Sequence, residues 1–461
     1  MAQLIAKKTP HVRRAERFLK IEYLPVAALT PDPKNARKHS KKQITLLAAN
    51  IREFGFTNPL LIDEKQQVIA GHARLEAAAS VPLERVPCVK IDGLTNTARM
   101  ALAIADNKIG DMSTFDLEIL SATLADLEML DFNVELTGFE TAEIDLLLDQ
   151  SATTSRSSAP DPADVVEPID PNAAAVSSVG DLWMLGDHRL LCGDALSAGS
   201  FSQLLGNELA DLIFSDPPYN VPIDKNVSGL GRVRHREFAM AAGEMSSREF
   251  TNFLSTALGL MAKFSRDGSI HYVCMDFRHI GELLEAGGSA YDELKNMCVW
   301  VKGSGGMGSL YRSEHELVFV FKKGNAPHIN NVQLGKFGRY RTNVWRYPGL
   351  NSFGRQRNEE LASHPTVKPV SLVADAIRDC SNRGGLVLDA FAGSGTTIIA
   401  AERTRRRAAA IELDPLYVDT AVRRWERFTG RAATLNGDGR TFAEVMTERG
   451  ALRLDQAVAG L

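Results

Sequence analysis

The first 150 residues alternate short apolar stretches with segments of helical spacing. In residues 40–55 apolar positions recur at helical intervals, with Ser40 placed as an N-cap and Gly55 as a helix end. Residues 58–81 predict a strand, a turn, a second strand and then a helix that starts near Gly71. A further strand is predicted at residues 85–92, and helices at residues 94–110 and 114–150. The pattern therefore predicts a small α+β unit trailed by helices.

Beyond residue 180 the apolar runs become continuous and end at acidic residues. Leu212–Ser215 runs directly into an aspartate, Leu386–Asp389 ends in one, and Arg407–Glu412 ends in a glutamate. A loop of small residues and a helix from about Thr396 lie between the last two runs, which makes a βαβ unit. The sequence "SEHELVFVFKKG" predicts another strand. These patterns predict an α/β unit whose acids meet at the carboxyl edge of a parallel sheet.

Composition divides the 461 residues at one place. Residues 151–178 are rich in Ser, Pro, Ala and Asp, so we expect a linker there, between residues 1–150 and 179–461. Hydrophobic content of 44% and charged content of 24% are ordinary for a soluble protein, and no apolar run has the length of a membrane span. The five cysteines are scattered without a CxxC pair, so we expect no metal or disulfide framework and a reducing cytoplasm.

Charge is distributed unevenly along the chain. Residues 1–50 hold 11 Lys/Arg against 3 Asp/Glu, whereas residues 111–180 hold 15 Asp/Glu against one basic residue. The basic arm is either a phosphate contact or a solvated tail. The acidic stretch would repel nucleic acid and indicates a connector or a helical surface.

The loop after the second acidic strand is suited to a nucleoside ligand. Gly393 and Gly395 let the backbone approach a ligand closely, and Glu412 is placed to accept hydrogen bonds from ribose hydroxyls. Dinucleotide cofactors use a similar geometry, so the loop does not identify the ligand.

The corner "LIFSDPPYN" carries the chemistry. Pro217 and Pro218 have no amide hydrogen, which leaves nearby carbonyls free to accept hydrogen bonds from outside the chain. Asp216 supplies another acceptor and Tyr219 a flat apolar face. Acceptors beside a stacking ring suit a planar base that carries an amine and is turned out of the DNA stack. A strand-ending turn is the alternative interpretation.

Three motifs, DPPY, "HPTVKP" and "FAGSGT", in this order, resemble the amino-group DNA methyltransferases of the permuted β-group, across about residues 180–440. The resemblance implies a Rossmann-like sheet with helices on both faces and S-adenosyl-L-methionine as cofactor. It implies site-specific methylation of double-stranded DNA by base flipping, as in restriction-modification. Asp at the first position of DPPY is typical of adenine-N6 enzymes, and cytosine-N4 remains the alternative.

The same resemblance assigns roles to single positions. The catalytic corner is Asp216, Pro217, Pro218 and Tyr219. The cofactor loop comprises Asp389, Phe391, Gly393, Gly395 and Thr396, with Asp389 near the methionine amine and Glu412 on the ribose. The methionine end is closed by His364, Thr366 and Lys368, with Lys368 or backbone amides offsetting its carboxylate. The cofactor adenine is assigned to Asp194, with Asp438 as a rival and a plain turn residue as the alternative for both.

Two segments are candidates for reading DNA. Residues 325–363 hold six Lys/Arg against two acids, interleaved with aromatic residues, and residues 221–250 form a flap beside the corner. Plain surface loops are the alternative. The expected DNA-contacting residues are Arg339, Arg341, Trp345, Arg346 and Arg355.

The N-terminal unit resembles the ParB/sulfiredoxin-like family in "NARKH", "PLLID", "VIAGHARLEAA" and "ADNKI", over about residues 20–115. The resemblance implies DNA or nucleotide binding. Gly71 and Arg74 lie where a helix N-terminus could hold a phosphate, and an ion pair that only stabilises the fold is the alternative for Arg74. The leading hypothesis is an adenine-N6 DNA methyltransferase, monomeric or homodimeric. A ParB-like DNA-binding protein with a vestigial methyltransferase half is the alternative from another class.

Overall fold

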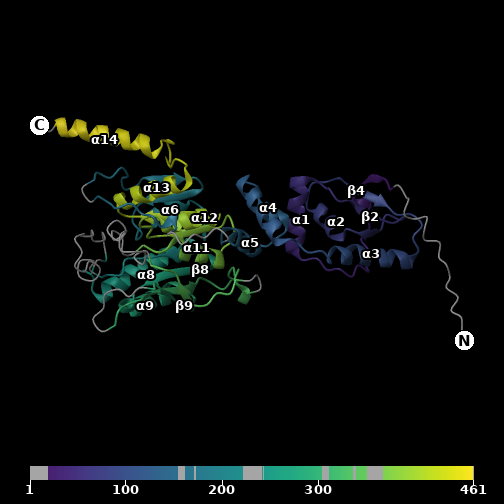
Figure 1. Cartoon of the computed structure of the whole chain (residues 1–461), viewed down its shortest axis with the longest axis horizontal. Helices are drawn as coiled ribbons and strands as arrows, with labels where there is room; N and C mark the ends of the chain where they lie inside the picture. The colour runs from purple at the N-terminus through teal and green to yellow at the C-terminus, as the bar shows by residue number, and fades with distance from the viewer. Residues whose placement is uncertain are drawn as a thin grey trace. The chain divides into compact units, whose positions relative to one another are not determined.

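The computed structural model describes residues 19–153, 161–170, 173–221, 241, 243–303, 311–335, 339–349 and 367–459. The chain forms two compact units, Met1–Glu140 and Thr141–Leu461 (Figure 1). The boundary lies ten residues before the expected one at residue 150. Within the described ranges no helix is both long and apolar enough to cross a bilayer.

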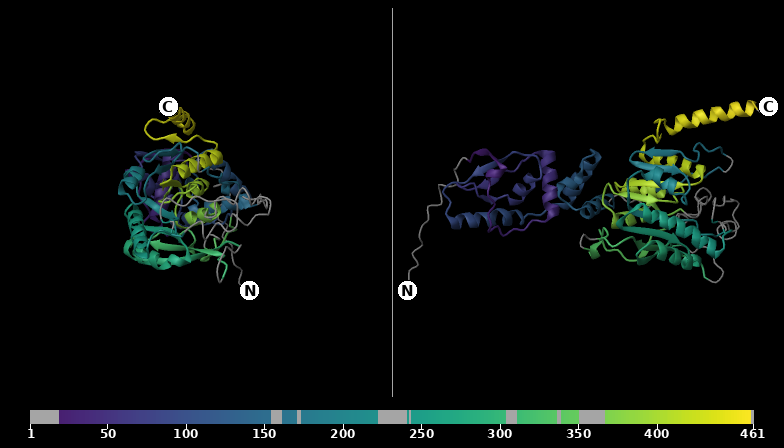
Figure 2. Two further views of the ribbon diagram at one scale, coloured as in Figure 1. Left: turned by 90° about the vertical axis from the view of Figure 1, so that its left-hand side faces the viewer. Right: turned by 180° about the vertical axis from the view of Figure 1, so that it is seen from behind.

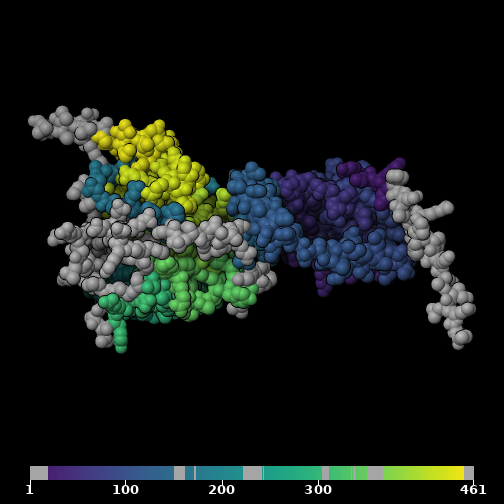
Figure 3. Space-filling view, viewed as in Figure 1, coloured from purple at the N-terminus to yellow at the C-terminus, as the bar shows by residue number. Residues whose placement is uncertain are grey.

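The N-terminal unit is built on a four-stranded mixed sheet in the order β1-β4-β2-β3. As predicted, Ser40 caps the first helix by accepting a hydrogen bond from the Gln43 amide at 3.1 Å, and Gly55 ends it with φ of 78°. Helix α3 has no fully buried residue and runs along the surface of this unit (Figure 3). The elements are β1 Ile21–Pro25, α1 Lys41–Phe54, β2 Leu60–Ile62, β3 Val68–Ala70, α2 His72–Ala79, β4 Arg85–Lys90, α3 Asn96–Gly110 and α4 Leu117–Met129.

The C-terminal unit contains a ten-stranded sheet in the order β11-β9-β10-β8-β7-β12-β13-β6-β5-β14. Strands β8, β7, β12, β13 and β6 run parallel to one another, and this block pairs with the antiparallel strands β10 on one side and β5 on the other. The strands are β5 Leu182–Leu185, β6 His188–Cys192, β7 Ala210–Ser215, β8 Ser265–Met275, β9 Glu293–Val301, β10 His315–Lys322, β11 Val344–Arg346, β12 Leu386–Asp389, β13 Arg407–Glu412 and β14 Thr434–Leu435. The helices are α5 Thr141–Thr153, α6 Ala198–Leu205, α8 Ser247–Lys263, α9 Ile280–Ala290, α11 Val370–Cys380, α12 Thr396–Arg403, α13 Pro415–Thr429 and α14 Phe442–Ala459.

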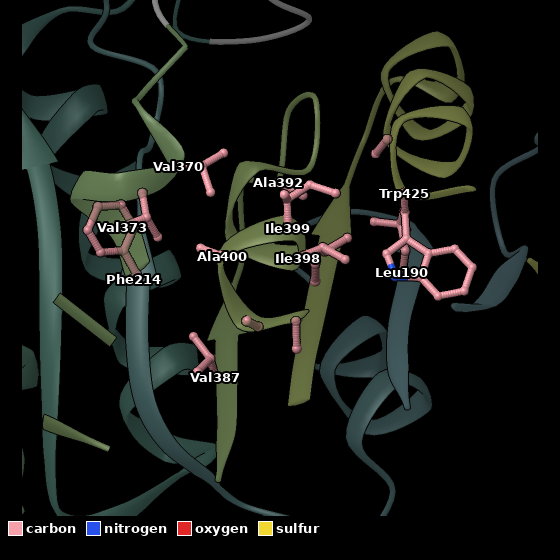
Figure 4. Close-up of a cluster of buried hydrophobic side chains, with 14 of the residues drawn as sticks. Leu190, Phe214, Val370, Val373, Val387, Ala392, Ile398, Ile399, Ala400 and Trp425 are labelled. Carbon is pink, nitrogen blue, oxygen red and sulfur yellow. The ribbon is translucent and has the colours of Figure 1, made fainter. Parts of the chain in front are cut away.

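The central strands are mostly apolar because both faces of the sheet are covered (Figures 1 and 2). Along β12, Leu386 and Leu388 pack with α6, α8 and α9, whereas Val387 packs with α11, α12 and α13. Figure 4 shows the second layer, where Val373 and Ile398 lie over the sheet. The prediction of a Rossmann-like sheet with helices on both faces is confirmed, and the carboxyl ends of its parallel strands form one edge.

The segment expected to be a linker is largely part of the second unit. Helix α5 is anchored by Asp145, which is 3% exposed and pairs with the fully buried Arg406. After it, Asp161 pairs with Arg403, and the Val176 amide donates to Asp419. The segment carries few large apolar residues, but polar anchors replace them. The correction therefore follows from ion pairs and backbone bonds that composition does not reveal.

Candidate active site

The catalytic corner lies at the carboxyl end of β7, at the ligand-binding edge of the sheet. Asp216 is 26% exposed, and its two oxygens have different partners. Oδ1 accepts a hydrogen bond from the Tyr219 hydroxyl at 2.6 Å, and Oδ2 contacts the Lys368 ammonium at 2.6 Å. Each oxygen keeps a second lone pair, so the carboxylate can accept further hydrogen bonds from a ligand.

Lys368 occupies a different place from the one expected. Its Nζ lies 2.6 Å from Asp216, 2.9 Å from Glu316 Oε2 and 3.0 Å from the Tyr219 hydroxyl, with the side chain only 3% exposed. An ammonium has three N–H donors, and all three are used within the protein. The assignment of Lys368 to the carboxylate of the cofactor is therefore corrected. His364 and Thr366, from the same motif, lie outside the described residues.

Glu316 is a site residue that sequence reasoning missed. It stands near the start of β10, where it is 12% exposed, and its other oxygen binds Lys302 at the end of β9. The signal was present as a single acid entering the apolar run "LVFVF". Such an acid needs a cationic partner if the strand is buried, and only the tertiary structure shows which cation it has.

The buried charges set one another's protonation. Burial raises the pKa of Asp216, and Lys368 offsets part of that rise. Burial also opposes ionisation of Glu316, but Lys368 and Lys302 outweigh it and lower the pKa of Glu316 to about 2. For Lys368 the two carboxylates outweigh burial and raise the pKa of its ammonium. Glu316 and Lys368 consequently stay charged near neutral pH.

The cofactor-loop candidates begin at Asp389, which links two strands. Asp389 Oδ1 accepts hydrogen bonds from the Phe391 amide at 3.0 Å and from the Ser215 hydroxyl at 3.3 Å, and Oδ2 accepts from Thr397 at 2.6 Å. Burial raises the pKa of Asp389 to about 6, against these bonds. Since Ser215 directly precedes Asp216, the glycine-rich loop and the catalytic corner are held together.

The turn into α12 requires glycine for two reasons. Gly395 has φ of 79°, and a Cβ there would lie 2.8 Å from the Ala421 Cβ. Arg424, 3% exposed on α13, donates to the Ser394 carbonyl at 3.1 Å and to the Thr396 hydroxyl at 3.0 Å. These contacts hold the loop in its shape before a ligand binds. Arg424 is, after Glu316, the second residue of the candidate site that the sequence analysis missed.

Glu412 lies where a hydroxyl-bearing ligand would need it. Its Oε2 accepts from the Gly393 amide at 2.8 Å and its Oε1 from the Asp414 amide at 2.9 Å. Burial raises the pKa of Glu412 to about 7 despite these bonds. A buried carboxylate held by two amides, with lone pairs left on both oxygens, fits a ribose diol.

The two candidates for the adenine end differ in their surroundings. The Gly193 amide donates to the Glu412 carbonyl at 2.9 Å, which places Asp194 beside the β13 end. Asp194 itself accepts a hydrogen bond from the Leu196 amide at 2.8 Å, as a turn residue does. Asp438 pairs instead with Arg440 on an exposed turn. The preference for Asp194 over Asp438 stays a prediction.

Three residues expected to contact DNA are interior. Arg339 and Arg341 pair with Asp379 at 2.7 and 2.9 Å, and Trp345 is 4% exposed in the edge strand β11. The reason is that Asp375 and Asp379 lie one turn apart on α11 and neutralise both guanidinium groups. Arg346 is exposed and keeps its expected role as a prediction, whereas Arg355 lies outside the described residues.

The second candidate segment is only partly described. Residues 222–240 and 242 lie outside the described residues, and residues 247–250 belong to α8 rather than to a flap. Asn220, directly after the corner, donates to the Met245 carbonyl at 2.8 Å and accepts from the Gly243 amide at 3.1 Å. Asn220 therefore ties the end of this segment to the catalytic corner.

The N-terminal unit has a pocket of about 380 Å³ at the start of α2, where Gly71 and Arg74 lie together. Arg74 donates to the Asn58 carbonyl and, at 3.1 Å, to the Pro59 carbonyl. Other polar residues of the lining are Arg37, His39, His72, Asp106 and Asn107. The wall thus combines cations with one carboxylate. The phosphate role of Gly71 and Arg74 stays a prediction.

Comparison with known proteins decides the family. Residues 210–423, which hold the catalytic corner and the glycine-rich loop, match the model described as DNA methylase of the N6/N4 type. Residues 12–108 match the ParB N-terminal domain, and residues 118–179 match the ParB-methyltransferase HTH domain. The chain carries an N6/N4-type DNA methylase domain together with a ParB-type N-terminal domain.

Individual relatives match the two parts of this methylase separately. The ParB-like nuclease domain-containing protein YnaK of Escherichia coli is 47% identical over 17% of the chain and 90% of its own length. The DNA adenine methyltransferase YhdJ of Escherichia coli is 26% identical over 51% of the chain and 81% of its own length. Among solved structures, PvuII DNA methyltransferase, titled cytosine-N4-specific, is 17% identical over 60% of the chain and 94% of its own, with a TM-score of 0.39.

The HTH match spans α4, α5 and the anchored segment up to residue 179. It therefore covers the residues that composition alone had assigned to a linker.

Proposed function

We propose that this methylase transfers a methyl group from S-adenosyl-L-methionine to the exocyclic N6 amine of adenine in double-stranded DNA. The observation that carries the proposal is the position of Asp216. It is a partly exposed carboxylate with free lone pairs, tied through Ser215 and Asp389 to a loop that fits a nucleoside. An acceptor for an amine and a cradle for a nucleoside therefore stand side by side.

The cofactor end is held by residues of the glycine-rich loop. Glu412 would accept hydrogen bonds from the ribose hydroxyls, the backbone at Gly393 and Gly395 would allow close approach, and Asp389 would bind the methionine amine. When bound, S-adenosyl-L-methionine supplies a methyl group that its sulfonium already activates. Contributions from the chain are thus positioning and electrostatics, without a covalent intermediate on the enzyme.

The base end is held by the catalytic corner. Asp216 and the Pro217 carbonyl accept hydrogen bonds from the amine, while Tyr219 stacks on the ring of the flipped base. These bonds would favour a pyramidal nitrogen and leave its lone pair exposed toward the glycine-rich loop, where the bound cofactor would supply the methyl group. Asp216→Ala should abolish transfer and leave the dissociation constant of the cofactor unchanged, and transfer retained by this variant contradicts the mechanism.

The acceptor base is assigned by the first residue of the motif. Asp at position 216 is typical of adenine-N6 enzymes, and the relative YhdJ is named as an adenine methyltransferase. Treated DNA should be digested to nucleosides and analysed by mass spectrometry. N6-methyladenine is the expected product. N4-methylcytosine alone would reassign the acceptor and keep the reaction type.

We propose a second binding function for the ParB-type domain, namely a nucleotide in the pocket at α2. Its support is the meeting of Gly71 at a helix N-terminus with Arg74 and Arg37 around about 380 Å³. Titration calorimetry with the four ribonucleoside triphosphates tests it on the full chain. Arg37 is exposed, so Arg37→Ala should weaken binding without unfolding the domain. Binding that survives this change unaltered, or no binding of any triphosphate, contradicts the proposal.

A further inference from the structure

Four residues of alternating charge form a row of ion pairs that ends at Asp216 in the catalytic corner. In order they are Lys302, Glu316, Lys368 and Asp216. They come from the end of β9, the start of β10, the entry of α11 and the end of β7. Because the four charges sum to zero, the row can stay ionised inside the protein.

Lys368 is the branching point of this row. Its three donors go to three acceptors, at 2.6 Å to Asp216, 2.9 Å to Glu316 and 3.0 Å to the Tyr219 hydroxyl. The acceptors fix the ammonium in all directions, and no donor is left for a ligand. Glu316 does not touch the open side of Asp216. Glu316 Oε2 also accepts a hydrogen bond from the Tyr219 hydroxyl at 3.3 Å, so an effect of Glu316 on the reaction passes through Lys368 and Tyr219, which both contact Asp216.

Removing Glu316 would change what Lys368 does to Asp216. Asp216 would then be the only carboxylate partner of the Lys368 ammonium, and the charge-assisted hydrogen bond between them would become stronger. Asp216 would become a weaker acceptor for the amine of the base. The Lys368 ammonium would also lose Glu316, the contact that keeps it on Asp216 Oδ2 alone. Both consequences act on the step in which the amine becomes pyramidal, and neither acts on cofactor binding.

We propose that Glu316 is a positioning residue for methyl transfer, which holds Lys368 so that Asp216 keeps one oxygen edge free and basic enough to accept the amine of the base. This inference rests on the proposed function of Asp216. It applies to adenine and to cytosine alike, since both present an exocyclic amine.

The test is Glu316→Gln in the full chain, with Glu314→Gln as the matched control. Glu314 lies two residues earlier with an exposed side chain, so the control removes the same charge outside the row. We expect kcat to fall roughly ten- to a hundredfold in Glu316→Gln, the loss of one charge-assisted hydrogen bond in the transition state. The dissociation constants of cofactor and DNA should stay within twofold of the wild type. Glu314→Gln should match the wild type in all three quantities.

The pH profile of kcat separates this role from a merely structural one. The titratable groups that face Asp216 are Tyr219, Lys368, Glu316, Cys274 of β8 and Asp389 of β12. The negative charge of Glu316 raises the pKa of Asp216, so the acid limb of the profile should move to lower pH in Glu316→Gln.

Three outcomes overturn the inference. They are an unchanged kcat in Glu316→Gln, an equal loss in Glu314→Gln, or a loss that lies in binding alone. If Glu316→Gln does not fold, Lys302→Gln decides, because it removes the outer partner of Glu316 and should lower kcat about two- to tenfold in the same direction. A wild-type chain that transfers no methyl group would overturn the proposed function and the role of Glu316 with it.

Discussion

The anchor of α5 can be tested by removing one carboxylate. Asp145 is 3% exposed and pairs with Arg406 at 2.8 Å and with Arg383 at 2.7 Å, and the Arg406 side chain is fully buried. In Asp145→Ala both guanidinium groups lose their carboxylate inside the protein. Breaking a buried ion pair from one side costs about 3–5 kcal/mol.

The lower end of that range is the better expectation. Arg406 keeps hydrogen bonds to the Ser381 carbonyl at 2.8 Å and to the Thr404 carbonyl, so its donors are only partly orphaned. We therefore expect the free energy of unfolding of the catalytic unit to fall by about 3 kcal/mol.

Tryptophan fluorescence during urea unfolding measures this loss selectively. All four tryptophans of the chain lie beyond residue 140, so the signal belongs to the second unit. Asp149→Ala is the matched control, since Asp149 is on the same helix but 39% exposed in its pair with Arg378. The Asp149–Arg378 pair is more exposed than the Asp145–Arg406 pair, so its loss should cost less. Equal effects of the two substitutions would refute the conclusion that α5 is an integral part of the catalytic unit.

Four further predictions concern the cofactor loop and the DNA surface. Gly395→Ala should lower the free energy of unfolding in urea by about 2 kcal/mol, because a residue with a Cβ is strained at φ of 79° and the added methyl would collide with Ala421. An unchanged unfolding midpoint would contradict the described turn. The pKa of Glu412 is raised to about 7, so cofactor affinity should rise roughly tenfold from pH 6 to pH 8 as the carboxylate ionises, and calorimetry should find this pH dependence absent in Glu412→Gln. The same raised pKa means that the unfolding free energy falls as pH rises from about 4.5 to 7, and Glu412→Gln should abolish that fall. Arg346→Ala should weaken DNA binding and lower its salt slope by about 1, whereas an unchanged slope removes Arg346 from the DNA surface.

The glycine-rich loop and its flanking strands were predictable because local rules fix them. The strands Leu386–Asp389 and Arg407–Glu412 and the helix start at Thr396 appear as the sequence indicated. Apolar runs, glycines and strand-ending acids are local signals, and the Rossmann-like order follows from them.

Charge partners were not predictable in the same way. Arg339 and Arg341 have the composition of a DNA-binding loop, and only the packing of α11 shows that Asp375 and Asp379 neutralise them. Likewise the motif around Lys368 suggested a cofactor contact, but the fold places its ammonium against Asp216. The sequence shows whether a side chain is acidic or basic, whereas its ion-pair partner depends on which helices and strands pack together.

The sequence by itself determined the reaction class, through the corner at Asp216, the glycine-rich loop, the acid at Glu412 and the order of the motifs. It also determined the two-part organisation and most of the elements. Only the tertiary structure decided that α5 and the segment after it belong to the second unit, and that Glu316 pairs with Lys368 beside Asp216. The physical reason is that motifs act through neighbours along the chain, whereas ion pairs join residues that are distant in sequence and become close only when the sheet has formed.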